Sequence, residues 1–223
     1  MKAQRPVLSY RSEIEVHPVK LFWSSRSPFV RKVMIFAHET GLADRITRER
    51  TVVAPTKPNA DVMRINPLNK LPTLILDDGR ALYDSRVIVE YLDGVHGGRR
   101  RIPEAGEARF EALRMQALCD GILDFLLVGL SERARPEAQQ SADLKAALAV
   151  KFKAAFDALD VEAAHLDVGR FGVAEIATSA VVGYADFRYG AEHWRDGRPN
   201  LAAFAEKIAE RASIVATAHA DVY

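Results

Sequence analysis

The hydrophobic and polar positions of this chain follow two different rhythms, one in each half. In the first half, short apolar runs rich in β-branched and aromatic residues alternate with helical stripes, and Val19–Trp23 is the first such run. An apolar run of this length and composition predicts a buried strand. From residue 104 onward, apolar residues recur at helical spacing almost throughout. The pattern therefore predicts an α+β half followed by an all-helical half.

Two parallel strands joined by a helix are predicted at the start of the first half. Pro28 suits the first turn of a helix, where its missing N–H costs nothing, and the apolar stripe after it continues to about Thr40. Ile46–Val53 is predicted as the second strand, and its place one helix downstream favours a parallel βαβ unit. Three prolines in 54–70 predict a loop with at most a short helix.

A hairpin and a helix complete the first half. Thr73–Leu76 and Ala81–Tyr83 flank an Asp-Gly pair, which is the strongest short-range hairpin signal. Asp84 or Ser85 then caps a helix whose predicted inward face consists of Val87, Ile88, Tyr91, Leu92 and Val95. The order β-α-β-(α)-β-β-α predicts a thioredoxin-like half, with a parallel pair, an antiparallel pair and helices on both faces.

The second half is predicted to be all helical. Its first long helix has an apolar face formed by Phe110, Leu113, Ala117, Leu118, Ile122, Phe125 and Leu126. A second spans about Ser141–Leu166, with an inward face of Leu144, Leu148, Phe152, Phe156 and Leu159. Gly172 and Glu175 predict an N-terminal box before a central core helix that runs to about Tyr189. The last two predicted helices are Leu201–Ile208 and Arg211–His219.

A linker between the halves is predicted at residues 93–103, which combine glycines, three arginines and a proline without periodicity. We therefore divide the chain into an N-terminal extension (1–18), a thioredoxin-like domain (19–96), a linker (97–103) and a helical domain (104–223). The arginine run is interpreted as a solvated linker rather than a nucleic-acid site, because it is short and the whole chain carries a net charge of +1.

Composition and charge narrow the function classes. Hydrophobic residues make up 48% of the 223 positions and charged residues 27%, which is typical of a globular protein. The near-neutral charge gives no reason to expect nucleic acid, and no apolar run approaches the roughly 20 residues of a membrane span. The N-terminus lacks the apolar core of a secretory signal. Cys119 is the single cysteine, so we expect neither a disulfide nor a metal, and a reducing cytoplasm.

Residues 66–92, NPLNKLPTLILDDGRALYDSRVIVEYL, contain the parts needed to hold a small acidic peptide. Leu71-Pro72 offers a backbone edge, and Asp84-Ser85 opens a helix whose N-terminus favours a carboxylate. SSRSPFVRKVMIFAHETGL, FGVAEIA and RPNLAAF…ERASIVAT extend this ordered set of motifs over 19–219. In these motifs the chain resembles the cytosolic glutathione transferases, and most of all the bacterial members near the theta, zeta and beta groups. The resemblance implies glutathione as co-substrate, a small electrophilic second substrate, a homodimer and a role in detoxification.

The resemblance assigns one group of glutathione to each motif. Leu71-Pro72 resembles the family's cis-proline step, which leaves the N–H and C=O of Leu71 to pair with the cysteinyl backbone; the alternative is a trans-proline that starts an edge strand. Lys70 is placed near the glycyl carboxylate, with a solvated lysine as the alternative. Asp84 and Ser85 are placed at the γ-glutamyl end, with a simple helix cap as the alternative.

The resemblance places the catalytic group just after the first strand, where the chain offers Ser24, Ser25 and Ser27. Because this stretch has no cysteine, mixed disulfides with glutathione are excluded. A serine hydroxyl can donate a hydrogen bond to the glutathione sulfur and stabilise the thiolate. Ser27, directly before Pro28, is favoured, followed by Ser25 and then Ser24. The alternative is that all three are turn residues and caps.

The expected reaction is attack of the glutathione thiolate on a small electrophile or a peroxide. The second substrate is expected against the first long helix, near Met115, Asp120, Leu123 and Asp124. Two other functions stay open. One is a zeta-like isomerase, although SSRSPFVR departs from the SSCSWR-like signature of that group. The other is a non-catalytic binding or interaction protein that keeps the fold.

Overall fold

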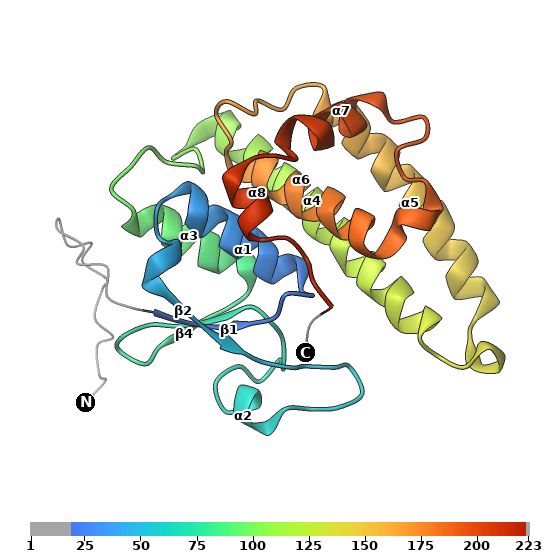
Figure 1. Ribbon diagram of the computed structural model, residues 1–223, viewed down its shortest axis with the longest axis horizontal. Helices are drawn as coiled ribbons and strands as arrows, with labels where there is room; N and C mark the ends of the chain where they lie inside the picture. The colour runs from blue at the N-terminus through green and yellow to red at the C-terminus, as the bar shows by residue number, and fades with distance from the viewer. Residues whose placement is uncertain (1–18, 222–223) are drawn as a thin grey trace.

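The computed structural model describes residues 19–221, and a four-stranded mixed sheet forms the base of its first half (Figure 1). The strand order is β2-β1-β3-β4. Strand β1 (Val19–Trp23) pairs in parallel with β2 (Ile46–Arg50) and antiparallel with β3 (Thr73–Ile75), which in turn pairs antiparallel with β4 (Ala81–Leu82). The predicted βαβ unit and hairpin are therefore both present, and the thioredoxin-like prediction is confirmed.

The second strand ends earlier than predicted. It stops at Arg50 rather than Val53, and the backbone N–H of Thr51 donates to the carbonyl of Trp23 at 2.8 Å as the chain leaves the sheet. Val52 is exposed, so its apolar side chain marks the loop and not a buried strand. The loop predicted from the three prolines follows, with the short helix α2 (Ala60–Met63) inside it.

Two helices separate the sheet from the second half. Helix α1 (Pro28–Glu39) and helix α3 (Ser85–Val95) lie between the sheet and the helical half, whereas α2 lies on the other side of the sheet (Figure 1). Helix α1 begins at Pro28, as predicted, and packs against the central helix of the second half. The start of α1 therefore lies where the two halves meet.

The second half is helical, as predicted. Helix α6, the central one, is buried along most of its length and packs against α1 and α4. The α-helices of this half are α4 (Gly106–Arg133), α5 (Ala142–Ala163), α6 (Val173–Tyr189), α7 (Pro199–Ile208) and α8 (Ala212–Ala216). The 3₁₀ turns of the chain are η1 (Ala43–Arg45), η2 (Glu137–Gln139) and η3 (Gly190–Glu192).

Helix α6 starts at the predicted box. The carboxylate of Glu175 accepts the N–H of Gly172 at 2.8 Å and the N–H of Asp167 at 3.0 Å. One side chain thereby satisfies the backbone N–H of the N-cap residue and one backbone N–H of the preceding loop. The prediction of this box is confirmed.

Two predicted inward faces need correction. Phe110 is 68% exposed and Val87 is 45% exposed, so neither belongs to the core. In α4 the buried side chains are Met115, Gln116, Cys119, Asp120, Ile122, Leu123 and Leu126, a face rotated from the predicted one. The buried face is rotated because α6 and α1 cover it. It includes the polar residues Gln116 and Asp120, which a hydrophobic pattern assigns to the outside of the helix.

Candidate active site

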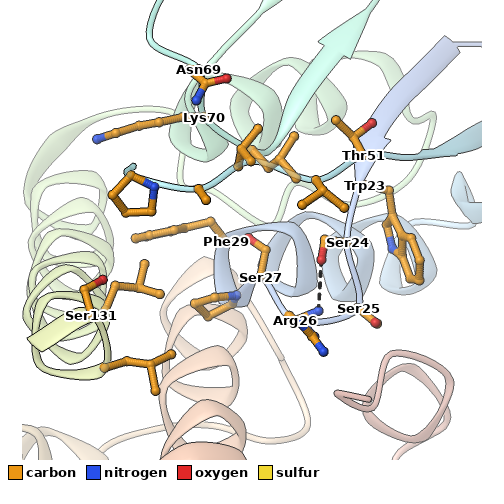
Figure 2. Close-up of a pocket in the computed structure, with 18 of the residues that line it drawn as sticks. Trp23, Ser24, Ser25, Arg26, Ser27, Phe29, Thr51, Asn69, Lys70 and Ser131 are labelled. Atoms are coloured by element: carbon orange, nitrogen blue, oxygen red, sulfur yellow. Dashed lines mark hydrogen bonds between the residues drawn. The ribbon is translucent and has the colours of Figure 1, made fainter. Parts of the chain in front are cut away.

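A cleft of about 680 Å³ lies where the two halves meet. Its walls come from the turn after β1 and the start of α1, from the loop after β2, from the segment before β3, and from α4 and α6. Figure 2 shows Ser27 at the start of α1, with Lys70 above it and Ser131 of α4 to its lower left. The predicted serines and the predicted glutathione edge thus share one cavity.

The three serines make different hydrogen bonds. Ser27 is the N-cap of α1, and its Oγ accepts the N–H of Val30 at 3.2 Å. The Oγ of Ser24 accepts the N–H of Arg26 at 3.3 Å. Ser25 instead donates its hydroxyl to the carbonyl of Ala220 at 2.8 Å and turns away from the other two (Figure 2).

These bonds decide which hydroxyl hydrogens are available. The hydroxyl hydrogen of Ser25 is already donated to the carbonyl of Ala220. Ser24 and Ser27 act as acceptors, and within residues 19–221 neither donates its hydroxyl to another group. Ser27 also lies at the positive end of α1, where a thiolate is electrostatically favoured.

The segment before β3 supplies the opposite wall. The Leu71-Pro72 peptide bond is cis, as predicted, and Lys70 and Leu71 line the cleft. The carbonyl of Lys70 accepts the hydroxyl of Thr73 at 3.0 Å, which holds the bend against β3. Leu71 precedes β3, and within the described part of the chain neither its N–H nor its C=O makes a backbone hydrogen bond in a turn or loop. Its N–H and C=O are therefore available as a short edge.

Asp84 and Ser85 lie at the N-terminus of α3, outside the cleft lining. Asp84 is the N-cap, and its carboxylate accepts the N–H of Arg86 at 2.9 Å. Ser85 is the first helical residue and is buried. Asp84 still acts on the cleft electrostatically. Burial raises the pKa of the Asp124 carboxyl, and among weaker influences Lys70 lowers it and Asp84 raises it.

The α4 residues expected near the second substrate divide into two groups. Asp124 lines the cleft, but Met115, Leu123 and Asp120 are buried elsewhere, so for these three the expectation was wrong. Asp120 accepts from the ammonium of Lys32 at 2.6 Å and from Arg86 at 2.8 Å. Its charge is therefore used inside the protein and does not face a ligand.

Sequence reasoning missed four cleft residues, which are Arg26, Arg50, Tyr184 and Arg188. Arg188 and Tyr184 come from α6, which was expected only to form core. Arg26 lies between two of the candidate serines and forms an ion pair with Asp221, Nε to Oδ1 at 3.0 Å. Arg26 stands within the predicted SSRSP motif but was given no role there, and the other three residues lie outside the predicted motifs.

Cys119 is not a nucleophile in this site. Its side chain is fully buried on α4, and burial raises the pKa of its thiol to about 12. The prediction of a small buried side chain is confirmed.

Two further searches cover only residues 19–221. No group of three or more His, Cys, Asp or Glu side chains in that range is arranged to bind a metal ion. No helix in that range is both long enough and apolar enough to cross a membrane.

Comparisons with known proteins agree with this geometry. Residues 26–95 match the family model of the glutathione S-transferase N-terminal domain, and residues 142–207 match that of the C-terminal domain. The chain is 33% identical over 201 residues to the uncharacterized GST-like protein YibF of Escherichia coli (strain K12), covering 89% of this chain and 98% of the relative.

Solved structures show the same likeness. A glutathione transferase family member from Pseudomonas fluorescens Pf-5 with bound glutathione is 38% identical, with a TM-score of 0.88 over 91% of this chain and 99% of the other. A second structure from that strain, with bound S-(propanoic acid)-glutathione, is also 38% identical, with a TM-score of 0.82 over 89% and 98%. From these matches, which span both halves, the chain belongs to the glutathione S-transferase family.

Proposed function

We propose that the protein is a glutathione transferase whose serine-assisted glutathione thiolate attacks a small electrophile or a peroxide. The observation that carries the proposal is the shared cleft, which joins the serines at the start of α1 to the Lys70–Leu71 edge. The relatives from Pseudomonas fluorescens, one with bound glutathione and one with a glutathione thioether, support a co-substrate of this kind.

Each part of glutathione has a candidate partner. The free backbone edge of Leu71 would pair with the cysteinyl residue, and Pro72 in cis holds that edge toward the cleft. Lys70 would face the glycyl carboxylate. Asp84 and Ser85 lie beyond the cleft lining and would receive the γ-glutamyl end at the N-terminus of α3, where the helix dipole favours a carboxylate.

Ser27 is the favoured catalytic residue, ahead of Ser25. A free thiol has a pKa of about 8.5, and lowering it by about two units to make thiolate the major form requires roughly 2.7 kcal/mol. A hydrogen bond from Ser27, together with the positive N-terminus of α1, can stabilise the thiolate by a free energy of this magnitude. Ser25 is disfavoured because its hydroxyl is donated to Ala220.

The proposal extends to the organisation of the protein. We propose a glutathione-binding domain at 19–96, a linker at 97–103 and a helical domain at 104–223, supported by family matches at 26–95 and 142–207. A homodimer, a cytoplasmic location and a role in detoxification follow from the family and belong to the same proposal.

Calorimetry with glutathione and turnover of a general electrophile test this function. Binding of millimolar glutathione is expected. Ser27→Ala should lower turnover about tenfold or more, because one charge-assisted hydrogen bond to the thiolate is lost, while glutathione affinity stays nearly unchanged. Ser131→Ala is the matched control, since Ser131 lines the same cleft from α4.

The outcomes separate the functions. Absence of heat at millimolar glutathione would overturn the proposal. Glutathione binding without turnover would indicate a binding protein. Normal turnover in Ser27→Ala would transfer the role to Ser24, to Ser25 or to the backbone at the start of α1.

A further inference from the structure

Two arginines at the edge of the cleft hold one carboxylate of the chain itself. Arg188 on α6 donates to Asp221 through both terminal nitrogens, Nη1 to Oδ2 at 2.8 Å and Nη2 to Oδ1 at 2.5 Å. Arg26 approaches the same carboxylate, Nε to Oδ1 at 3.0 Å. We call Arg26 and Arg188 the arginine pair. Together they form a planar, bidentate receptor for a carboxylate.

The arginine pair belongs to the cleft wall. Both residues line the cavity, and Arg26 directly precedes Ser27 in the chain. Tyr184, one turn before Arg188 on α6, lines it as well. Burial raises the pKa of the Tyr184 hydroxyl to about 12, so this group is a neutral donor in the cleft. A carboxylate bound here would lie close to the candidate sulfur ligand.

Asp221 is easily replaced on the arginine pair. Its side chain is 51% exposed, against 21% for Arg188 and 31% for Arg26, so water and salt reach this carboxylate and screen its side of the ion pairs. Within residues 19–221, the rest of its segment is held by the hydroxyl of Ser25 to Ala220 at 2.8 Å, by the ring of His219 to the carbonyl of Ser25 at 2.9 Å and by the stacking of that ring on Phe187. A ligand carboxylate from the cleft could take the place of Asp221 at small cost.

The charge of the cleft points the same way. Among the described residues, its charged lining consists of Arg26, Arg50, Lys70 and Arg188 and the carboxylate of Asp124. Lys70 is assigned to glutathione, at the opposite wall. Arg26 and Arg188 share the carboxylate of Asp221, so displacing Asp221 would expose their positive charge on the side of the cleft where the second substrate would enter.

We propose that the arginine pair anchors a carboxylate of the second substrate, and that Asp221 occupies this anchor when no substrate is bound. The substrate class is thus a small electrophile that carries a carboxylate. The inference rests on the proposed glutathione transferase function and names the substrate class of the same site.

A matched pair of substrates tests this anchor, 4-chloro-3-nitrobenzoate and 4-chloro-3-nitrobenzamide. With either one, the glutathione sulfur forms a bond to the ring carbon that carries chlorine, the C–Cl bond breaks and chloride leaves with the bonding electrons. The thiol proton passes to solvent. The two are nearly equal in size but differ in the charge of the group para to chlorine and in the reactivity of the ring, so the change in the ratio of their kcat/KM values between wild type and a variant measures recognition of the carboxylate.

Two variants move this ratio in opposite directions. Arg188→Gln should lower kcat/KM for the acid about tenfold and change it for the amide less than about twofold. Asp221→Asn, which removes the internal competitor, should raise kcat/KM for the acid through a lower KM and leave the amide unchanged. Arg195→Gln is the control, because Arg195 forms a similar bidentate pair with Asp186 and does not line the cleft.

Binding of the free acid and the free amide, measured by calorimetry without glutathione, provides an independent readout. The acid should bind Asp221→Asn more tightly than wild type and should lose this gain in the double variant Asp221→Asn/Arg188→Gln. Equal effects on acid and amide in both assays would overturn the anchor while leaving the glutathione result intact. Failure to bind glutathione would overturn the proposed function, and the free-acid titration would still decide on the anchor.

Discussion

Three serines within four positions of the turn after β1 carry different hydrogen bonds. Ser27 caps α1, Ser24 accepts from the backbone of Arg26, and Ser25 donates to a carbonyl 195 positions away. Their chemical type is identical, so only the direction of each side chain separates a candidate sulfur ligand from an attachment point for the C-terminal segment. At the residue scale, the local backbone assigns the chemistry.

Another residue whose surroundings decide its role is Gly183 on α6. A Cβ at this position would overlap the guanidinium of Arg31, which is buried and donates to the carbonyl of Ile214 at 3.4 Å. We expect Gly183→Ala to destabilise the protein by about 1–3 kcal/mol, because Arg31 must move within a packed interior. Urea unfolding measures this change.

Gly121 provides the matched control, since it also lies within a long helix. An added Cβ there meets nothing within 4 Å. Gly121→Ala should therefore be neutral or stabilising by up to about 1 kcal/mol, through helix propensity alone. Equal stability changes in the two variants would show that Arg31 moves aside without cost.

At the element scale, the segment after α8 returns to the start of α1, beside the serines of the site (Figure 1). His219 is central to this attachment. Its ring stacks on Phe187 with centroids 5.0 Å apart, and its Nδ1 hydrogen-bonds to the carbonyl of Ser25 at 2.9 Å. Burial, aided by the nearby charges of Arg31 and Arg188, lowers the pKa of His219 to about 4.

This lowered pKa predicts that the segment detaches as pH falls. The released histidine binds a proton near pH 6.5, whereas the attached one does so only near 4, so attachment is strongest above 6.5 and weakens between 6.5 and 4. At pH 5.5 the loss amounts to about 1.4 kcal/mol. Hydrogen exchange of residues 217–221 at about pH 7.5 and 5.5, corrected for the intrinsic rate, measures it.

His219→Phe keeps the ring contacts but cannot titrate. Its segment should show the same corrected protection at both pH values, while the control His165→Phe, at an exposed position after α5, should behave as wild type. An undiminished pH response in His219→Phe would assign the effect to another group.

At the scale of the whole molecule, α1 joins the two halves through buried charge. Lys32 is fully buried, and its ammonium donates to Asp120 of α4 at 2.6 Å. Burial lowers the pKa of Lys32, opposed by the attraction of Asp120. At the C-terminal end of α1, Glu39 accepts from Arg211 at 2.6 and 2.7 Å. The sheet half and the helical half are therefore held together at two points along one helix.

Replacing Lys32 tests how much the buried ion pair with Asp120 contributes to stability. Lys32→Met is expected to destabilise the protein by about 2–4 kcal/mol, because Asp120 stays buried with only Arg86 as a partner. The double variant Lys32→Met/Asp120→Leu should recover most of this loss. Chemical denaturation measures both.

Lys20 is the matched lysine for comparison. It pairs with Glu49 at 2.9 Å, and both side chains are about half exposed. Lys20→Met should therefore change stability by less than about 1 kcal/mol. If Lys32→Met cost no more than Lys20→Met, the buried pair would not join the two halves energetically.

The sequence by itself determined the features that depend on neighbouring residues. Pro28 marks the start of α1, and Gly172 and Glu175 mark the start of α6. Both rest on backbone geometry within a few positions, which residue type controls directly. The parallel pairing of β1 with β2 was predicted as well, since one helix between two strands favours a parallel pair. The cis Leu71-Pro72 step, in contrast, was expected only from the resemblance to the family.

Only the tertiary structure decided which side chains share the cleft. The burial of Asp120, the exposure of Phe110 and the meeting of Arg26 with Asp221 all depend on contacts between residues distant in the chain. Hydrophobic periodicity assigns faces to a single helix, but the partner helices and the returning C-terminal segment choose which face is covered. For this reason the sequence predicts the residues that we propose hold glutathione, and the fold adds the two arginines that we propose hold the second substrate.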